Sequence, residues 1–562
     1  MNRSAIFHMT SGTYAYAVDE HSLCIRLRTA KNDCNQAIIH YMNVYDHSED
    51  RKKTNMQKIL QDEYFDMYEA KITLKERHFK YFFEIKGEKE KVYFTSDGFM
   101  NSKVKNENSF FFPVINDDEV YNLPKWAEGA TIYQIFVDRF NSSSDKWFIN
   151  AKWNEIPKRN HYFGGDFKGI ANKLDYIKSL GTDIVYLSPV FSSTTNHKYD
   201  IEDYYSIDEM FGGKKELIKL SEAIHTRGMH IVLDCVFNHM SCYNQIFQDV
   251  IQKGLKSEYK DWFYIDNYPV SIENCNYDTF AGCVPSMPRI NTSNQHAIDY
   301  LVNSAAYWTK ELNIDGWRLD VADEVSISLW RKFRTEILKA NHEALIIGEI
   351  WNDASKWMNG DQIHTVTNYK YRKWVLDFIE GKIDSEVFWE KMASNNMLYK
   401  TMSFNYLINL LGSHDTKRIT SIIGHDKAIL ALLMTLSFQG IGLIYYGDEI
   451  GLKGMDDPDN RRTMPWESIS DESIKPYREL ALLKTKYLSL KYGMVKPVII
   501  DKNVISFERT ISEQTVEIYA NFSEKDVIIS EKHLIYHYPK NEDINKSINR
   551  IKAMSFAICI KK

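Results

Sequence analysis

The 562-residue sequence contains few cysteines, and their spacing supports no cysteine-based chemistry. The seven cysteines are scattered along the chain and their number is odd. No two of them have the short spacing of a zinc or redox motif, and the set predicts no disulfide framework. A disulfide-stapled scaffold and a cysteine-ligated metal site are therefore not expected.

Long apolar runs are missing as well. No run is long enough to span a bilayer, and the first residues lack the continuous apolar segment of a signal peptide. We therefore expect a cytoplasmic protein with no membrane partner. Its substrate would then be a molecule that is already inside the cell.

There is also no excess of positive charge. Lysine and arginine number 70 against 76 aspartates and glutamates, and the net charge is −6. Such a balance gives no electrostatic reason to expect a nucleic acid or an anionic membrane as partner. No internal repeat or low-complexity tract stands out.

What the sequence does have is typical of a large globular protein. Hydrophobic residues make up 44% and aromatic residues 14% of the chain. Its length exceeds what one hydrophobic core usually organises, so several domains are expected. The aromatic rings would suit stacking on sugar faces, although any single ring is more often part of a core.

Three regions follow one another along the chain. Short alternating runs such as 23–28 and 81–85 predict a β-sandwich over residues 1–122. Between 123 and 486, strands alternate with helices such as 167–180 and 215–227. Short strands at 498–502, 504–508, 515–519 and 555–560 predict a C-terminal β-sandwich domain over 487–562.

The middle region predicts an α/β fold, a (β/α)₈ TIM barrel. Its active site would lie at the carboxyl ends of the strands. A long irregular excursion at 240–295 follows the third strand. The eight expected strands are 130–136, 183–188, 229–234, 316–320, 345–349, 364–369, 407–413 and 442–446.

Three acidic residues fall at the ends of separate predicted strands: Asp320, Glu349 and Asp415. Cleavage of a glycosidic bond needs two carboxyl groups, one to protonate the leaving oxygen and one to meet the positive charge that develops on the sugar. Arg318 lies two residues before Asp320 on a strand, so both side chains project to the same face. A guanidinium there should favour the ionised carboxylate that a nucleophile needs.

The other two acids also have informative neighbours. Glu349 follows an apolar run and precedes Trp351, whose indole could desolvate the carboxyl group, raise its pKa and suit it to a general acid. His414 and Asp415 are adjacent and can reach one ligand only if the strand has already given way to a loop.

Each acid alone also has an ordinary structural explanation. Asp320 could pair with an arginine that packs a barrel mouth, Glu349 could cap a helix, and Asp415 could form an Asx-turn. The three together, at successive barrel rims, favour a glycosidase.

At this point the chain resembles the α-amylase family, glycoside hydrolase family 13, and within it the neopullulanase, cyclomaltodextrinase and maltogenic amylase group. Segments 234–239 (Asp-Cys-Val-Phe-Asn-His), 316–324, 348–351 and 412–415 are similar to the four principal signature segments of the family. Met-Pro-Arg-Ile-Asn at 287–291 resembles the Met-Pro-Lys-Leu-Asn marker of the group. Further matches lie at 161–166, 196–200, 445–449 and 457–462.

The resemblance implies a role for particular residues. Asp320 would be the nucleophile, Glu349 the acid/base and Asp415 the third carboxylate, which grips sugar hydroxyls as the ring distorts. The residues implied in substrate binding are Tyr199, Asp234, His239, Phe280, Arg318, Glu324, Trp351, His414, Asp457 and Arg461. For Phe280, Glu324 and Trp351 on the acceptor side, core packing or a solvated face is an equal alternative.

Some positions depart from the family pattern. Asp323 stands where relatives usually carry Asn, and Ile201 where they often carry Thr. Some relatives bind calcium in the loop after the first barrel strand, and here that loop is poor in ligands. The weak candidates are Asn141, Asp145, Gly165 and Asp166, and calcium prefers roughly six to eight oxygens. No other cofactor is implied.

The sequence thus predicts a retaining α-glucan hydrolase that cleaves α-1,4 bonds of cyclomaltodextrins, maltooligosaccharides or pullulan, with some transglycosylation. By the resemblance, the N-terminal domain would mediate a homodimer. One alternative is an α-glucosidase or isomaltase-type enzyme on the same barrel. A second is a non-catalytic glucan-binding protein, which the presence of all three acids disfavours.

Overall fold

The computed structural model describes residues 1–48, 50–102, 104–282, 284–540 and 543–561, and these form two compact units. The first unit contains Met1–Leu123, Ser355–Asp361 and Glu386–Phe404, and the second contains Pro124–Ala354, Gln362–Ser385 and Asn405–Lys562. The chain therefore passes between the units several times. The limits of the three predicted domains stay predictions.

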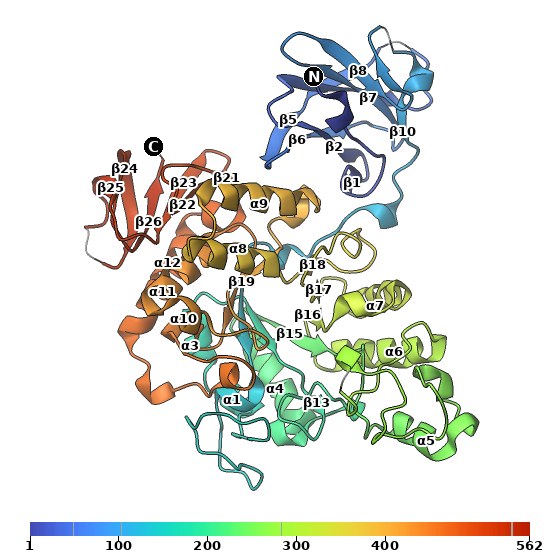
Figure 1. The fold of residues 1–562 in the computed structure, drawn as a ribbon, viewed down its shortest axis with the longest axis vertical. Coiled ribbons are helices and arrows are strands. Elements are labelled where there is room, and N and C mark those ends of the chain that lie inside the picture. Colours follow the sequence, from blue (N-terminus) through green and yellow to red (C-terminus); the bar gives the residue numbers. More distant parts are fainter. Residues whose placement is uncertain (49, 103, 283, 541–542, 562) are drawn as a thin grey trace. The chain divides into compact units, whose positions relative to one another are not determined.

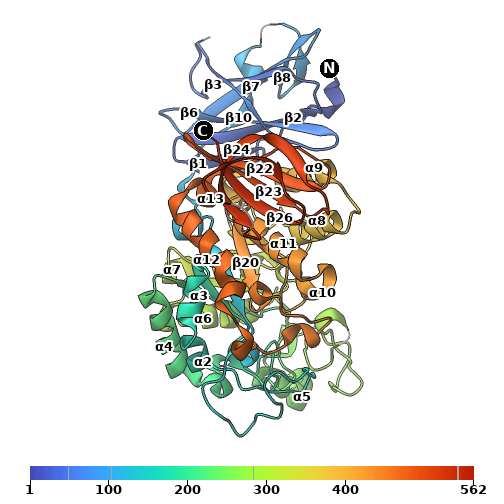
Figure 2. The same cartoon turned by 90° about the vertical axis from the view of Figure 1, so that its left-hand side faces the viewer.

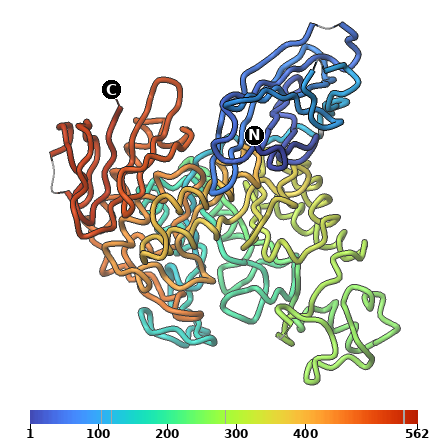
Figure 3. Tube along the Cα trace, turned by 45° about the horizontal axis from the view of Figure 1, so that its top comes forward, coloured from blue at the N-terminus to red at the C-terminus, as the bar shows by residue number. Residues whose placement is uncertain are grey.

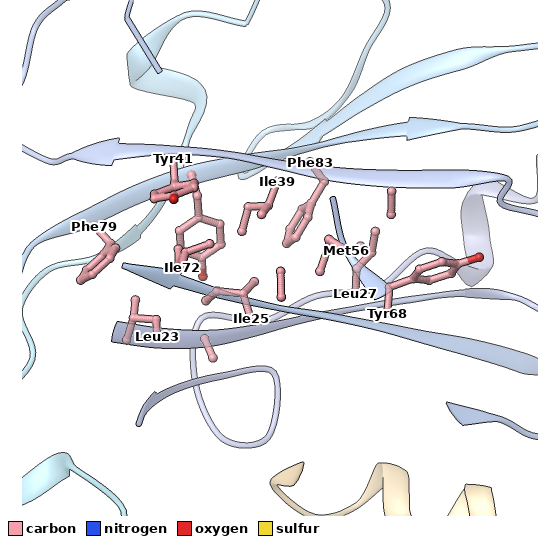
Figure 4. Packing of buried hydrophobic residues seen from close by; sticks show 14 of the residues in the cluster. Leu23, Ile25, Leu27, Ile39, Tyr41, Met56, Tyr68, Ile72, Phe79 and Phe83 are labelled. Atoms are coloured by element: carbon pink, nitrogen blue, oxygen red, sulfur yellow. The ribbon is translucent and has the colours of Figure 1, made fainter. Parts of the chain in front are cut away.

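The N-terminal region is the predicted β-sandwich (Figure 1). Side chains such as Leu23 and Ile25 from one sheet and Ile39 and Phe83 from the other are fully buried between the sheets, as Figure 4 shows. This follows from the period-two alternation of apolar residues. One sheet has the order β1 (Ala15–Asp19), β2 (Ser22–Ala30), β6 (Phe65–Thr73), β5 (Gln57–Gln61); the other has β4 (Lys52–Asn55), β3 (Gln36–Asn43), β7 (Phe79–Lys86), β8 (Lys91–Thr95), β9 (Gly98–Met100), with β10 (Phe110–Phe112) paired to β7.

A fully buried arginine joins the sandwich to the later segment of its own unit. Arg26 donates from Nε to Glu69 Oε2 at 2.8 Å and from Nη1 to the carbonyl of Tyr399 at 2.6 Å. Its Nη2 donates to Thr401 Oγ1 at 2.5 Å. A buried guanidinium needs such partners, because an uncompensated charge is costly in the interior. Residues near 400 thus complete the N-terminal unit.

The predicted barrel is confirmed. Its eight strands are parallel and largely apolar, and a parallel bridge between Thr367 and Ile408 joins the two end strands of the sheet. In sheet order they are β18 (Thr365–Val366), β17 (Leu345–Gly348), β16 (Gly316–Leu319), β15 (His230–Cys235), β12 (Ile184–Leu187), β11 (Thr131–Ile135), β20 (Ile441–Tyr445) and β19 (Ile408–Leu410).

Helices alternate with these strands, as predicted. The helix expected at 215–227 is α4 (Gly213–Thr226), but the one expected at 167–180 is divided into α2 (Phe167–Ala171) and α3 (Leu174–Ser179), because Lys173 has left the helical conformation. Every helix among the described residues is too short or too polar to cross a bilayer. The others are α1 (Val137–Phe140), α5 (Gln245–Lys253), α6 (Gln295–Glu311), α7 (Ile327–Ala340), α8 (Tyr369–Ile379), α9 (Ser385–Met397), α10 (Ile419–Ile423), α11 (His425–Ser437), α12 (Asp471–Lys486) and α13 (Ser489–Tyr492).

The excursion after the third barrel strand is present between β15 and α6. It contains α5 and short 3₁₀ turns, and Figure 3 shows it in green as a lobe at the edge of the barrel. Isolated antiparallel bridges between His239 and Arg289, and between Phe263 and Ile290, fix its returning end. A small hairpin of β13 (Phe191–Ser192) and β14 (Asp203–Ile207), which the sequence analysis did not predict, follows the second barrel strand.

The C-terminal region forms one antiparallel sheet, whereas the sequence analysis expected a sandwich. The predicted strand at 498–502 is wrong, because Val498 and Ile499 lie after a strand end and Ile499 is exposed. The sheet packs on α11 and α13 within the second unit (Figure 2). Its order is β21 (Met494–Pro497), β22 (Val504–Ile511), β23 (Gln514–Asn521), β26 (Ser555–Ile560), β24 (Val527–Tyr538), β25 (Ser547–Ile551).

Candidate active site

Asp234, Asp320 and Glu349 lie at the carboxyl ends of three neighbouring barrel strands, β15, β16 and β17. Asp234 on β15 is paired in register with Arg318 on β16. Just beyond the strand ends, the N–H of Asp320 donates to Cys235 O at 2.9 Å and that of Glu349 donates to Leu319 O at 3.0 Å. These backbone bonds continue the ladder past β16 and β17, so their side chains enter the rim from fixed positions.

Arg318 joins these carboxyl groups. Its Nη1 lies 2.9 Å from Asp234 Oδ1 and 2.7 Å from Asp320 Oδ1, and its Nη2 lies 2.8 Å from Glu349 Oε2. All four side chains are buried. Arg318 and Asp320 thus face the same way, as their spacing on the strand predicted. One guanidinium is shared by three carboxyl groups.

Burial shifts the pKa of two acids in this cluster. It raises the pKa of Asp320 well above its usual range, and the Glu349 and Asp234 carboxylates add to it although Arg318 opposes it. Burial also raises the pKa of Glu349. Arg318 lowers the pKa of Asp320, as expected, but desolvation acts more strongly in the opposite direction. Two such carboxyls titrate as a pair, so the pair retains a proton to higher pH than free carboxyls would.

A strained residue positions Glu349. Val321 has a left-handed backbone conformation (φ 44°, ψ 49°), which a β-branched residue seldom adopts. This turn directs its N–H to Glu349 Oε2 at 3.0 Å. The next N–H, of Ala322, donates to the carbonyl of Glu349 at 3.1 Å. Such strain persists where the surroundings fix it, and here both partners belong to Glu349.

The third acid, Asp415, belongs to a second, neighbouring cluster. His414 and Asp415 follow β19 in a loop, as their adjacency required, and His414 Nε2 lies 3.0 Å from Asp415 Oδ2. Burial acts to raise the pKa of Asp415, but His414 and Arg461 outweigh it and hold that pKa well below its usual range. Asp415 is therefore ionised across the neutral range.

Tyr199 connects the two clusters. Its hydroxyl donates to Asp234 Oδ2 at 3.0 Å and also bonds to His414 Nε2. Its ring is stacked on the imidazole of His414, with centroids 5.3 Å apart and planes 8° apart. The half-buried tyrosine therefore presents a flat, fixed surface at the rim.

Arg461 and Asp457 extend the second cluster. Arg461 Nη1 lies 2.9 Å from Asp457 Oδ1, its Nη2 lies 3.4 Å from Asp415 Oδ1, and its Nε donates to the carbonyl of His414 at 2.9 Å. The arginine is buried while the Asp457 side chain is 40% exposed. Asp457 can thus offer a carboxylate to a polar ligand.

Three further predicted residues are Phe280 in the excursion, His239 immediately before it, and Glu324 in the turn after β16. His239 is buried, its ring lies 4.6 Å from that of Phe280, and neither ring nitrogen makes a well-formed hydrogen bond in the described part of the chain. Burial lowers the pKa of His239 to about 3, although the Tyr199 carbonyl acts to raise it, so the imidazole is neutral. Glu324 is half-exposed and accepts a bond from Asn238 Nδ2 at 3.0 Å.

Trp351 follows Glu349 at the open side of the cluster. It is 44% exposed, and its ring stacks on Tyr369 with centroids 3.7 Å and planes 3° apart. Its Nε1 lies 3.3 Å from Glu349 Oε1. The ring therefore excludes water from the carboxyl group of Glu349, which favours its protonated form. The indole N–H, which donates to the same group, favours its ionised form.

Three of the four candidate calcium ligands take part in other bonds. Asp166 Oδ1 caps α2 through the N–H of Gly169, and its Oδ2 lies 2.6 Å from Lys146 Nζ. The amide of Asn141 donates to the carbonyl of Gly169, the N–H of Gly165 donates to the carbonyl of Asp138, and Asp145 is exposed. These residues do not fit a calcium ion, because an ammonium group already contacts the one buried carboxylate among them.

Sequence reasoning missed several residues that support the site. The Gln134 amide lies 2.9 Å from His414 Nδ1, and the Tyr186 hydroxyl donates to Asp234 Oδ2 at 2.6 Å. Both are polar residues inside apolar barrel strands, and this pattern in the sequence could have marked them as site residues. Val321 carries no such signal, because its side chain gives no indication of a left-handed backbone.

Two protein-family models match the chain. The model described as "Alpha amylase, catalytic domain" matches residues 134–479, and "Alpha amylase, N-terminal ig-like domain" matches residues 1–116. The first covers most of the barrel and all three acids. The chain therefore belongs to the α-amylase family of glycoside hydrolases.

Individual relatives place it in one group of that family. The chain is 40% identical to neopullulanase 2 of Thermoactinomyces vulgaris (92% of this chain and 90% of the relative) and 35% identical to the intracellular maltogenic amylase of Bacillus subtilis (93% and 91%). A solved cyclomaltodextrinase superposes over 100% of both chains with a TM-score of 0.92 and 33% identity. It is thus similar to the neopullulanase, cyclomaltodextrinase and maltogenic amylase enzymes.

Substitutions of Trp351 test how this residue controls Glu349. In Trp351→Ala, water reaches the carboxyl group, its pKa falls, and the alkaline limb of the pH–kcat/KM profile should move to lower pH. In Trp351→Phe, a ring remains on Tyr369 but the N–H is lost, so the limb should move to higher pH. The measurement is the pH–rate profile of both variants. Shifts of the same sign would contradict this assignment.

Proposed function

We propose that this protein is a retaining α-glucan hydrolase that cleaves α-1,4 bonds of cyclomaltodextrins, maltooligosaccharides or pullulan, with some transglycosylation. The observation that carries the proposal is the buried Arg318, bonded to Asp234, Asp320 and Glu349 at one barrel rim. Relatives named neopullulanase, cyclomaltodextrinase and maltogenic amylase support the substrate class.

Asp320 is the nucleophile and Glu349 the acid/base. Asp320 attacks the anomeric carbon while Glu349 protonates the leaving oxygen, and Glu349 then deprotonates the water or sugar hydroxyl that releases the glycosyl-enzyme. The pair's retained proton suits this division, since one carboxyl must be ionised while the other is protonated. Asp415, held ionised, accepts hydrogen bonds from sugar hydroxyls.

The remaining site residues bind the sugar on either side of the bond. Tyr199 supplies a stacking surface, and Asp457 with Arg461 holds sugars on the non-reducing side. The neutral imidazole of His239 and the His414 ring complete the cleavage site. The acceptor side is formed by Phe280, Glu324 and Trp351.

We further propose a cytoplasmic location and no required organic or redox cofactor. The relative named as an intracellular maltogenic amylase supports the location. A substrate that is already inside the cell, such as a short or cyclic maltooligosaccharide, fits this proposal.

The substrate class is tested by a parallel product profile on β-cyclodextrin, pullulan and soluble starch. We expect faster turnover of β-cyclodextrin than of starch, with maltose as a main product and transfer products at high sugar concentration. Release of glucose alone from maltooligosaccharides would instead favour an α-glucosidase or isomaltase-type enzyme.

Conservative substitutions test the two catalytic roles. Glu349→Gln should lower kcat on natural glucans by about 10²–10⁴-fold with glucan binding retained, and azide should partly restore cleavage of a substrate with an activated leaving group. Asp320→Asn should lose activity on both substrates. The control is Asp323→Asn, which makes the same change at an exposed neighbour and should leave activity unchanged. An active Asp320→Asn would place the nucleophile elsewhere.

A homodimer that limits substrate size is a separate proposal, supported by the N-terminal β-sandwich. A stable interface of this kind buries more than roughly 1,000 Å². Removal of the sandwich is not a clean test, because Arg26 also bonds to Tyr399 and Thr401. We expect the intact protein to elute at twice its 65.9 kDa chain mass.

Dilution then provides the test of that dimer. Light scattering should follow dissociation, and the preference for β-cyclodextrin over starch should fall in parallel, while turnover of a short maltooligosaccharide stays constant as the control. A monomeric full-length protein that still rejects starch would remove the dimer from the explanation and point to the 240–295 excursion.

A further inference from the structure

The loop after the first barrel strand, residues 141–166, contains a lysine whose ammonium group is surrounded by oxygens. Lys146 Nζ lies 2.6 Å from Asp166 Oδ2, 3.0 Å from the carbonyl of Gly164 and 3.3 Å from the carbonyl of Met210. The hydroxyl of Ser143 also donates to Asp166 Oδ2, at 2.7 Å. The lysine side chain is only 17% exposed.

These contacts tie together segments that are distant in sequence. Asp166 caps α2, Gly164 ends the loop, and Met210 belongs to the 3₁₀ turn Glu209–Phe211 beyond β14. A carboxylate and two carbonyls that face one point are the ligand types a hard divalent cation prefers. Here a covalently tethered ammonium supplies the positive charge and donates the hydrogen bonds.

The same loop supports the donor side of the active site. Asp138 accepts bonds from the N–H groups of Phe163 and Gly164 at 3.1 and 3.0 Å. Its neighbour Arg139, fully buried, donates to the carbonyl of Arg461 at 2.9 Å. Arg461 in turn contacts Asp415, so a displaced loop would disturb the groups that bind the sugar.

We propose that Lys146 takes the place of a structural divalent cation in this loop, so that the enzyme holds its donor side without calcium. Asp166 is buried and would be left uncompensated without a cation. Lys146 acts as a positioning residue, since its contacts are with the loop and the turn. It makes no direct contact with the three acids among the described residues.

The test uses the full-length protein and three variants. Lys146→Met removes the ammonium, Lys146→Asp removes it and adds a carboxylate, and Lys168→Met is the control, because Lys168 is an exposed lysine on α2. Thermal unfolding, bound calcium by elemental analysis, and KM and kcat on β-cyclodextrin are measured after EDTA treatment and again with excess calcium chloride.

We expect the wild type and Lys168→Met to hold no calcium and to have the same Tm in EDTA and in calcium. Lys146→Met and Lys146→Asp should unfold at least about 5 °C lower in EDTA, with KM raised more than kcat is lowered. Calcium should restore both Tm and KM of Lys146→Asp, with one equivalent bound.

Three results would overturn the proposal. One is wild-type protein that retains calcium or loses stability in EDTA. A second is Lys146→Met with unchanged Tm and KM. The third is a destabilised Lys146→Asp that calcium does not restore, which would make Lys146 an ordinary buried ion-pair partner.

Discussion

The active site depends on one buried cation. Arg318 lies among Asp234, Asp320 and Glu349, and no more than a few per cent of any of these side chains is exposed. Carboxyl groups that are buried close together repel one another and are costly to ionise, so burial raises their pKa values. The guanidinium of Arg318 lowers the pKa of Asp320 and of Glu349, but it does not cancel the effect of burial. Asp320 and Glu349 therefore have raised pKa values and share protons as a pair, and hydrolysis of an acetal needs one protonated and one ionised carboxyl group.

The barrel makes this arrangement possible by its register. Parallel strands end at the same rim, and a two-residue offset along β16 places Arg318 and Asp320 on one face. The loop residues are then fixed by backbone hydrogen bonds, above all at Val321. There the N–H groups of Val321 and Ala322 both donate to Glu349, and these two bonds offset the strain of the left-handed backbone. The second cluster, of His414, Asp415 and Arg461, has its own charge balance and keeps its acid ionised. The two neighbouring clusters thus shift the pKa of their acids in opposite directions, upward for Asp320 and Glu349 and downward for Asp415.

Much of this architecture could be predicted from the sequence. The eight barrel strands are short apolar runs, each followed by a turn or loop, and the acids stand at their ends, so strand order alone places Asp320 and Glu349 near each other. The raised pKa of Asp320 could not be predicted, because it depends on how much water the folded rim excludes. Lys146 could not be recognised either, since its partners lie in Gly164, Asp166 and Met210. The strand expected at 498–502 failed because an apolar run was not buried.

The passage of residues 386–404 into the N-terminal unit has a consequence for synthesis of the chain. The sandwich has its own core and can form as soon as its strands leave the ribosome. Arg26, however, has no access to Tyr399 and Thr401 until the ribosome has made most of the barrel. At roughly 5–20 residues per second this delay is on the order of tens of seconds. During that time a guanidinium destined for the interior stays in water, so the first unit to emerge is completed only after most of the barrel has been made.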